Sequence, residues 1–227
     1  LANSEHDVKK VVIASSRSIY GEGKYWSKEL NKVVYPNHRK DDFMNKSDFE
    51  VKYEGNTGEL ELMPTDEESK IHPSSVYGIT KQNQEQMIMT VCPTIGIAPV
   101  AFRYQNVYGP GQSLKNPYTG ILSIFSTLIR NGNDINIFED GKESRDFVFI
   151  EDVVSATILG IENNNANNNV FNVGSGIPTS VIEVANELIE NYGVDTTIKI
   201  SGNYRLGDIR HNYADLKKIK SHLGFEP

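Results

Sequence analysis

The sequence predicts an α/β fold built around a parallel β-sheet. Short apolar runs at 9–15, 98–103 and 170–173 have the composition of buried strands. Segments of helical character lie between these runs, and parallel strands need such long crossover connections. The centre of the first run, Val11–Ala14, is entirely apolar, which is typical of a strand that is covered on both faces.

Capping signals and periodicity locate the remaining elements. Ser74 or Ser75 can cap a helix over 76–91. Residues 24–72 are polar and rich in charge, and we expect this segment to be irregular. An amphipathic helix is expected over 118–130, followed by strands at 135–138 and 147–150 and a helix from Glu151. After a strand at 170–173, Thr179 or Ser180 forms a capping box with Glu183 at the start of a helix that runs to Asn191. A strand near 196–200 and a short helix after Asp215 complete the expected elements.

Composition excludes several classes of function. The formal net charge of -7 over 227 residues argues against nonspecific binding of nucleic acid, which needs clustered positive charge. No apolar run approaches the roughly 20 residues that cross a bilayer, so we expect no membrane partner. Cys92 is the sole cysteine, which rules out an internal disulfide and a cysteine-rich zinc site. We expect a buried thiol, no bound metal and a cytoplasmic location.

Tyr77 and Lys81 form the most informative motif. Residues four apart share one helix face, and an ammonium beside a phenol stabilises the phenolate. The strand at 9–15 runs into Ser15 and Ser16, whose hydroxyls can bind the same substrate oxygen. Such a set can move a proton on or off an alcohol while hydride leaves its carbon. The spacing alone also fits a solvated pair on a helix surface.

Further motifs follow in a fixed order along the chain: Arg17–Gly21, Pro73–Val76, Arg103–Gly111, Asp140–Gly141 with Ser144–Phe147, Asn172–Gly176 and Arg205–Asp208. In this order they resemble the extended short-chain dehydrogenase/reductases that act on nucleotide sugars, the NAD-dependent epimerase/dehydratase family. The resemblance covers nearly the whole chain. It implies a Rossmann-like, doubly wound parallel sheet with a smaller α/β lobe that binds the substrate.

The resemblance also implies a division of the chain. Residues 1–110 correspond to the C-terminal half of the NAD-binding domain, and 111–227 mainly to the nucleotide-sugar lobe, with 147–173 returning to the Rossmann sheet. We interpret 24–72 as an insertion over the sugar site, although a surface loop without a role fits equally well. Because no strand runs into G-x-x-G-x-x-G and a helix, we expect the N-terminal part of the sheet to be missing and the fragment alone to be inactive.

Family roles transfer to matching positions of this sequence. The implied catalytic residues are Ser16, Tyr77 and Lys81, with Tyr77 as base. The residues implied to bind the cofactor NAD are Ser15, Tyr77, Lys81 and Tyr104. Those expected to bind a nucleotide-diphosphate sugar are Ser16, Arg17, Ser18, Asn106, Phe138, Arg145, Arg205 and Asp208. Arg145 could instead pair with Asp146 or Glu143, and Phe138 could instead lie in the core.

The reaction is narrowed by the residues after Ser16. Arg17 and Ser18 stand where 4,6-dehydratases of the family carry an acidic pair, so we expect no elimination. Three strings, 15–23, 112–123 and 204–211, resemble dTDP-L-rhamnose 4-epimerases, although the usual cysteines of that group are not found here. We therefore expect an NAD-dependent 4-epimerase acting on a dTDP-6-deoxyhexose such as dTDP-L-rhamnose.

Three alternatives remain at this point. The same machinery would serve a UDP-hexose 4-epimerase, or an NADPH-dependent 4-keto reductase or decarboxylating enzyme. A dinucleotide-binding sensor or scaffold without chemistry is disfavoured, because it need not keep Ser16, Tyr77 and Lys81. The helix that carries Tyr77 also presents Met87, Ile88 and Val91. The family implies a homodimer through this helix, although the three side chains could also be ordinary core.

Overall fold

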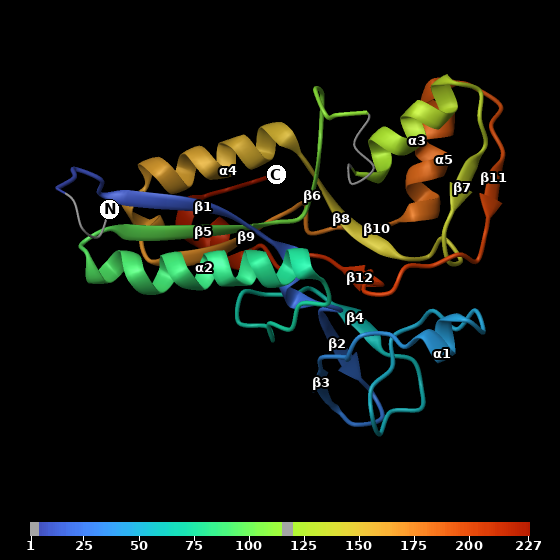
Figure 1. Ribbon diagram of the computed structural model, residues 1–227, viewed down its shortest axis with the longest axis horizontal. Helices are drawn as coiled ribbons and strands as arrows, with labels where there is room; N and C mark the ends of the chain where they lie inside the picture. The colour runs from blue at the N-terminus through green and yellow to red at the C-terminus, as the bar shows by residue number, and fades with distance from the viewer. Residues whose placement is uncertain (1–4, 115–119) are drawn as a thin grey trace.

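A three-stranded parallel sheet forms one end of the molecule. The computed structural model describes residues 5–114 and 120–227. The strand order is β1-β5-β9, with β1 at Lys10–Ser16, β5 at Ala98–Tyr104 and β9 at Asn169–Val173. All three strands run parallel, so their carboxyl ends lie at the same edge of the sheet (Figure 1).

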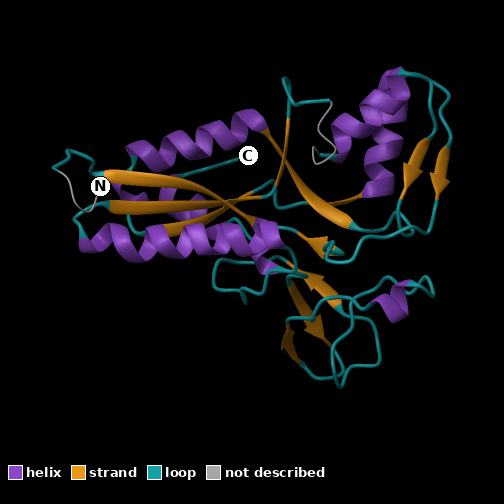
Figure 2. Ribbon diagram, in the orientation of Figure 1, coloured by secondary structure: helices purple, strands orange, loops and turns teal. Residues whose placement is uncertain are grey.

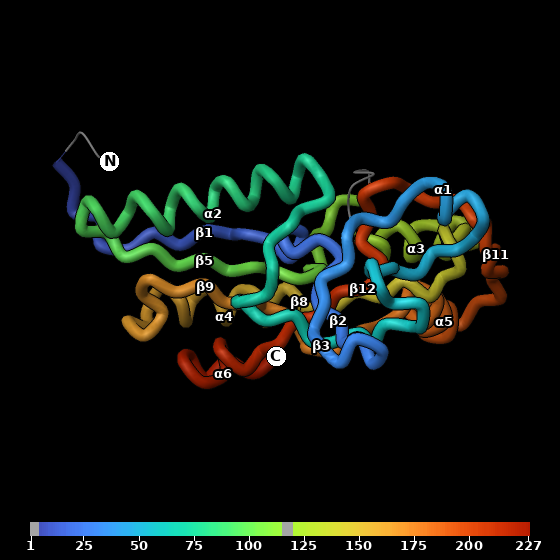
Figure 3. Tube along the Cα trace, turned by 90° about the horizontal axis from the view of Figure 1, so that it is seen from below, coloured from blue at the N-terminus to red at the C-terminus, as the bar shows by residue number. Residues whose placement is uncertain are grey.

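Helices cover both faces of this sheet. Helix α2 (Val76–Thr94) lies on one face, and α4 (Ile150–Glu162) with α6 (Lys217–Leu223) lies on the other (Figure 3). The main apolar core forms between the second pair of helices and the sheet, around Phe102, Phe171 and Ile219, none of which is exposed. This sandwich fixes the edge where the strands end, which is where the site is built.

A second sheet continues from that edge into the other lobe. Strand β8 (Ser144–Phe149) pairs parallel with β6 (Asn106–Tyr108) and β12 (His211–Asn212), and antiparallel with β10 (Pro178–Ser180). Beyond it, α3 (Ile121–Arg130) and α5 (Val181–Tyr192) pack against the parallel pair β7 (Ile135–Ile137) and β11 (Ile198–Ile200). The predicted capping box is confirmed, because Ser180 and Glu183 bond reciprocally at the start of α5.

The segment 24–72 differs from the irregular loop that its composition predicts. It contains an antiparallel sheet, β3-β2-β4, formed by Lys32–Val34, Lys24–Ser27 and Glu61–Met63, and a short helix α1 at Asp41–Met44 (Figure 2). Trp26 stands directly opposite Glu61 in the β2–β4 register. A small apolar cluster of Tyr25, Val34 and Val51 closes over these strands. The strands are too short for their alternation to show in a charge-rich sequence.

Three other observations bear on the sequence predictions. Strand β8 starts three residues earlier than expected and pairs in the second sheet, whereas β9 joins the three-stranded sheet. The division of the chain into domains stays a prediction. Cys92 is a buried, unbridged thiol, as expected. Among the described residues, no helix combines the length and the hydrophobicity that a bilayer crossing requires.

Candidate functional site at the carboxyl edge of the sheet

The carboxyl ends of β1 and β5 bring two predicted residues together. Ser16 and Tyr104 are direct partners in the parallel register. The Ser16 hydroxyl oxygen accepts hydrogen bonds from the backbone N–H of Ser18 at 3.2 Å and from the Ser18 hydroxyl at 2.9 Å. The Tyr104 phenol is directed elsewhere, to the Thr157 hydroxyl at 2.7 Å on α4. Only the backbone of Tyr104 therefore stands beside Ser16.

Helix α2 places Tyr77 next to this strand end. Its first turn is capped by Ser75, whose hydroxyl accepts from the backbone N–H of Gly78 at 3.1 Å. The helix approaches so closely that a Cβ on Gly78 would lie 2.7 Å from the carbonyl oxygen of Ser18. Glycine alone permits this approach. As a result Tyr77 stands beside the segment 16–18, and its side chain remains 57% exposed.

Lys81 lies one turn further along the same helix. Its ammonium donates to the carbonyl oxygen of Ala14 at 2.8 Å. The same nitrogen lies 5.8 Å from the centre of the Tyr77 ring. An ammonium has three donors, so two N–H groups remain beside Tyr77 for a further partner. Lys81 thus joins the Tyr77 helix to β1 and holds positive charge near the phenol.

Beneath these residues lies a buried polar network. The carboxylate of Glu85 pairs with Arg103 and accepts the Ser15 hydroxyl at 2.5 Å. Arg103 also donates to the Tyr20 phenol at 2.7 Å, and that phenol donates to Asn172 at 2.8 Å. Burial raises the pKa of Tyr20, so its phenol stays protonated. The Ser15 side chain is thereby committed to Glu85, and any contact of Ser15 with a cofactor falls to its backbone.

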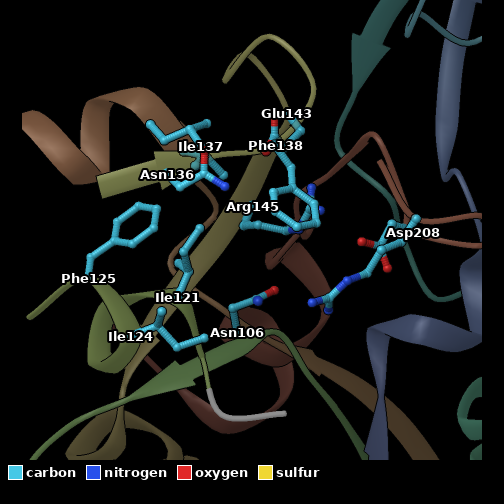
Figure 4. A pocket seen from close by; sticks show the side chains of 12 residues that line it. Asn106, Ile121, Ile124, Phe125, Asn136, Ile137, Phe138, Glu143, Arg145 and Asp208 are labelled. Atoms are coloured by element: carbon cyan, nitrogen blue, oxygen red, sulfur yellow. The ribbon is translucent and has the colours of Figure 1, made fainter. Parts of the chain in front are cut away.

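A cavity of about 370 Å³ opens on the other side of the strand ends. Figure 4 shows the side chains of Asn106, Phe138 and Arg145 around its centre, with Asp208 at one side. Apolar side chains of α3 form its opposite wall. Its lining residues are Asn106, Ile121, Ile124, Phe125, Asn136, Ile137, Phe138, Glu143, Arg145, Val181, Arg205 and Asp208.

Arg145 and Arg17 make one part of this site strongly positive. Arg145 donates to the carbonyl oxygens of Ser144 at 2.8 Å and Arg210 at 3.0 Å, and among the described residues it makes no ion pair. The alternative in which Arg145 pairs with Asp146 or Glu143 is thereby disfavoured. Burial, with the repulsion of the Arg145 guanidinium, lowers the pKa of Arg17 to about 9. Two neighbouring, partly buried guanidinium groups suit an anionic ligand.

The aromatic and acidic residues of the cavity come from two loops. The Arg205 guanidinium lies 5.3 Å from the centre of the Phe138 ring, within cation–π range. Both line the cavity, as does Asp208, so Phe138 is not a core residue. The Asn106 side-chain oxygen is buried and has no hydrogen-bond partner within the described residues, which leaves an acceptor unused next to the arginines.

Glu143 is a lining residue that the sequence did not single out. It is buried, and burial raises the pKa of its carboxyl group. Its nearest cation is Arg210, at 3.6 Å. The only signal in the sequence was its place between Gly141 and Arg145, which does not distinguish a lining side chain from a solvated one.

A direct contact connects the two halves of the site. The Ser74 hydroxyl, just before the Tyr77 helix, donates to the carbonyl oxygen of Gly207 at 2.8 Å. Gly207 has φ +88°, and a Cβ there would lie 2.9 Å from the Ser74 carbonyl oxygen. The loop of Arg205 and Asp208 is therefore docked against the start of α2. Every predicted site residue lies either at the strand ends, on α2 or around the cavity.

Comparisons with known proteins identify the family. Residues 54–174 match the NAD dependent epimerase/dehydratase family. A dTDP-L-rhamnose 4-epimerase from Burkholderia thailandensis is 36% identical over 220 residues, covering 97% of this chain and 59% of the relative. The chain belongs to the NAD dependent epimerase/dehydratase family, and its cofactor is NAD.

Solved structures place the fold among epimerases of this family. The UDP-N-acetylglucosamine 4-epimerase from Methanobrevibacter ruminantium M1, in complex with UDP-N-acetylmuramic acid, superposes with a TM-score of 0.76 at 28% identity, covering 97% of this chain and 58% of that one. The UDP-glucose 4-epimerase from Thermotoga maritima, with UDP-glucose, gives 0.73 at 30% identity, with 97% and 59% covered. The chain thus spans less than two thirds of the length of these relatives.

The residues at the strand ends fit the nicotinamide end of NAD. Lys81 has donors left after its bond to Ala14, which suit the hydroxyls of a ribose. The Tyr77 phenol is exposed beside it, and the backbone of Tyr104 lies at the same edge. Within the described residues, no group of three or more His, Cys, Asp or Glu side chains could hold a metal ion.

Proposed function

We propose that the protein is an NAD-dependent nucleotide-sugar 4-epimerase that works by transient oxidation at C4. One observation carries the proposal: the Ser74–Gly207 hydrogen bond docks the loop of Arg205 and Asp208, which line the cavity, against the start of the helix that carries Tyr77 and Lys81. A nucleotide-diphosphate sugar has a matching layout, with a reacting sugar hydroxyl at one end and a diphosphate and nucleoside at the other.

Tyr77 is proposed as the proton acceptor for the C4 hydroxyl. Ser16 hydrogen-bonds the same oxygen, and Lys81 stabilises the phenolate that accepts the proton. When bound, NAD supplies the two-electron oxidation at C4 and its reversal. The substrate passes through a 4-keto sugar, and Tyr77 then returns its proton to the C4 oxygen. No electrons are gained or lost over the whole cycle.

Inversion requires the keto sugar to turn while the rest of the substrate stays fixed. Arg145 and Arg205 are proposed to hold the diphosphate, since a guanidinium matches phosphate oxygens with two parallel hydrogen bonds. Asp208 is proposed to bind the nucleoside ribose, and Phe138 to lie against the base. Asn106 and Arg17 are proposed to bind the substrate between these residues and Ser16. The keto sugar can therefore rotate about its bonds to the diphosphate while the diphosphate and nucleoside stay bound.

We propose dTDP-L-rhamnose as the substrate, or another dTDP-6-deoxyhexose. The Burkholderia relative supports this choice. The sequence Arg17-Ser18 after Ser16 lacks the acidic pair that elimination needs, which argues against a dehydratase. A UDP-hexose is the second candidate, supported by the Thermotoga epimerase. The two differ in the base that lies near Phe138, in the 2′-hydroxyl of the pentose near Asp208, and in the substituent at C6 of the sugar.

The deciding experiment is NMR of the natural, whole protein in deuterated water. dTDP-L-rhamnose is supplied without added cofactor, with UDP-glucose in a parallel sample and the Tyr77→Phe variant as control. Conversion to the 4-epimer without deuterium at ring carbons would establish internal return of hydride. Turnover that requires NADPH and a keto sugar would instead indicate a reductase. Deuterium at C5 or C6 would indicate elimination.

We also propose a homodimer formed through α2, and a cytoplasmic location. Met87 and Val91 are 59% and 46% exposed on this helix, and Ile88 is half-buried. Apolar side chains in such a row are typical of a helix that packs on a partner. Sedimentation analysis of Met87→Glu, with the exposed Gln86→Glu as control, would test the contact. A Met87→Glu protein that sediments like the wild type would contradict it.

A further inference from the structure

An arginine of the segment 24–72 reaches the loops that line the cavity. The guanidinium of Arg39 forms a two-pronged ion pair with Glu139, with both N–O distances at 2.8 Å. The two side chains are only 4% and 5% exposed. Arg39 also donates to the carbonyl oxygen of Asp208 at 2.9 Å. One side chain thus holds both loops from outside the cavity.

Each of the two contacts fixes a residue next to a proposed ligand of the nucleotide. Glu139 directly follows Phe138 and has φ 49°, a left-handed conformation that costs free energy for a residue with a side chain. Its backbone N–H donates to the carbonyl oxygen of Asn203 at 2.7 Å. The ion pair with Arg39 holds Glu139 in this conformation. The backbone of Glu139 in turn fixes the orientation of the neighbouring Phe138 side chain.

A fully buried arginine supports Glu139 from the other side. Arg210 donates to Glu139 at 2.9 Å and to Asp140 at 2.7 Å. It also pairs with Glu50 of the segment 24–72 at 2.5 Å. Arg39 is balanced in turn by Glu22, at 3.4 Å. Two arginines and four carboxylates therefore form one network in which each carboxylate faces a guanidinium: Arg39, Arg210, Glu22, Glu50, Glu139 and Asp140.

A second contact joins the same parts at the surface. The Tyr204 hydroxyl lies 2.6 Å from a carboxylate oxygen of Asp41 and 2.6 Å from the side-chain oxygen of Asn45. Tyr204 immediately precedes Arg205, whose guanidinium covers the Phe138 ring. This bond is independent of Arg39, so the segment 24–72 holds the 203–208 loop at two separate places.

We propose that the segment 24–72 is a structural part of the nucleotide-binding site, and that Arg39 is a positioning residue for Phe138, Arg205 and Asp208. The inference rests on the proposed function for the identity of the ligand, but not for the role of Arg39. Arg39 touches none of the reacting atoms. It acts through Glu139 and Asp208, and these contacts favour a role for the segment over a surface loop without one.

The test uses two variants of different severity and a control from the same segment. Arg39→Lys keeps the positive charge but cannot form the two-pronged pair. Tyr204→Phe removes only the exposed hydrogen bonds to Asp41 and Asn45, so this variant is expected to fold. Lys28→Met is the control, because Lys28 forms an exposed ion pair with Glu61. Hydrogen exchange of the natural, whole protein is measured at 137–141 and 203–208.

We expect faster exchange at these two segments in Arg39→Lys, faster exchange at 203–208 in Tyr204→Phe, and no change in Lys28→Met. Exchange equal to the wild type in both test variants would overturn the proposal. Calorimetry with free dTDP and UDP measures the consequence for binding: Arg39→Lys weakens the affinity about tenfold, while kcat at saturating sugar nucleotide stays within about threefold.

The two readouts separate the proposals. A fall in kcat with unchanged nucleotide affinity would overturn the role of Arg39 in binding. A wild-type protein that binds neither dTDP nor UDP would refute the proposed function, and the exchange rates of the variants would then decide the positioning role of Arg39 alone.

Discussion

Glu85 and Arg103 form a buried ion pair, with 2.6 Å between Oε1 and Nη2, that fastens the Tyr77 helix to the central strand of the sheet. Glu85 lies on the same side of α2 as Lys81, one turn further on. The strand residue next to Arg103 is Tyr104, which pairs with Ser16. The proposed proton-transfer residues thus owe their spacing to a contact that takes no part in the chemistry.

Removal of this carboxylate should destabilise the whole fold. Glu85→Ala leaves the Arg103 guanidinium buried without its partner, and breaking a buried pair in this way costs about 3–5 kcal/mol. We expect that loss in the free energy of unfolding measured by urea denaturation. Gln86→Ala, on the exposed side of the same helix, should change it by no more than about 0.5 kcal/mol. Equal losses in the two variants would contradict the interpretation.

Tyr77→Phe should abolish most turnover while leaving nucleotide binding intact. Loss of a positioned acid–base group lowers kcat by about 10²–10⁴-fold. The phenol is exposed, so its removal costs the fold little. The measurement is a progress curve of epimer formation together with calorimetry of dTDP binding. Tyr192→Phe, at the end of α5, is the matched control. A Tyr77→Phe variant that keeps the wild-type kcat would contradict the role of Tyr77 as the base.

Arg145→Met should act on substrate affinity. Its guanidinium is proposed to hold the diphosphate in ground state and transition state alike, and such uniform binding appears in KM. Loss of a charge-assisted hydrogen bond of about 1.5–3 kcal/mol predicts a KM that rises about 10- to 150-fold. Arg130→Met, on the exposed last turn of α3, is the control. A lower kcat at unchanged KM would mean that Arg145 acts in the chemical step instead.

Stability at acid pH should depend on Glu50. The hydrogen bond from His211 lowers the pKa of this carboxyl group, burial opposes the shift, and Arg210 adds to it, with a net value of about 2. Because the folded-state pKa lies below the unfolded value of about 4.3, the contribution is complete above that pH and is lost as the pH falls through about 2.

Urea denaturation of wild type and Glu50→Gln across this range checks the sign. The difference in unfolding free energy between them should be constant from pH 5 to 7 and shrink below about pH 4. Glu61→Gln, which alters the exposed pair with Lys28, is the matched control. A difference that grows on acidification would show that the carboxylate of Glu50 is not stabilised by its neighbours.

Features set by local sequence were the ones that could be predicted. The capping box of Ser180 and Glu183, the helix that begins after Ser75, and the strand that ends at Ser16 all depend on residues a few positions apart. The polar start of β8 was missed, because Ser144 and Arg145 are held by pairing with distant strands rather than by their own propensity.

The supports of the site could not be predicted for the same reason. Arg39 and Glu139 are a hundred positions apart, and Arg210 lies 71 positions beyond Glu139. A single sequence gives no information on which of its charges meet after folding. The motifs around Tyr77, Arg145 and Arg205 identified candidate ligands, but their positions relative to one another depend on these long-range ion pairs.

The register of β2 and β4 brings the two ends of the segment 24–72 close together. Trp26 and Glu61 face one another across antiparallel strands, so the polypeptide leaves and re-enters the parent fold at adjacent points. A two-residue turn can join such strands directly. Residues 27–60 can therefore be exchanged between homologous enzymes as one unit, provided that the incoming segment supplies partners for Glu139 and Arg210 in place of Arg39 and Glu50. Such chimeras would make the segment an exchangeable element for altering which nucleotide sugar the enzyme accepts.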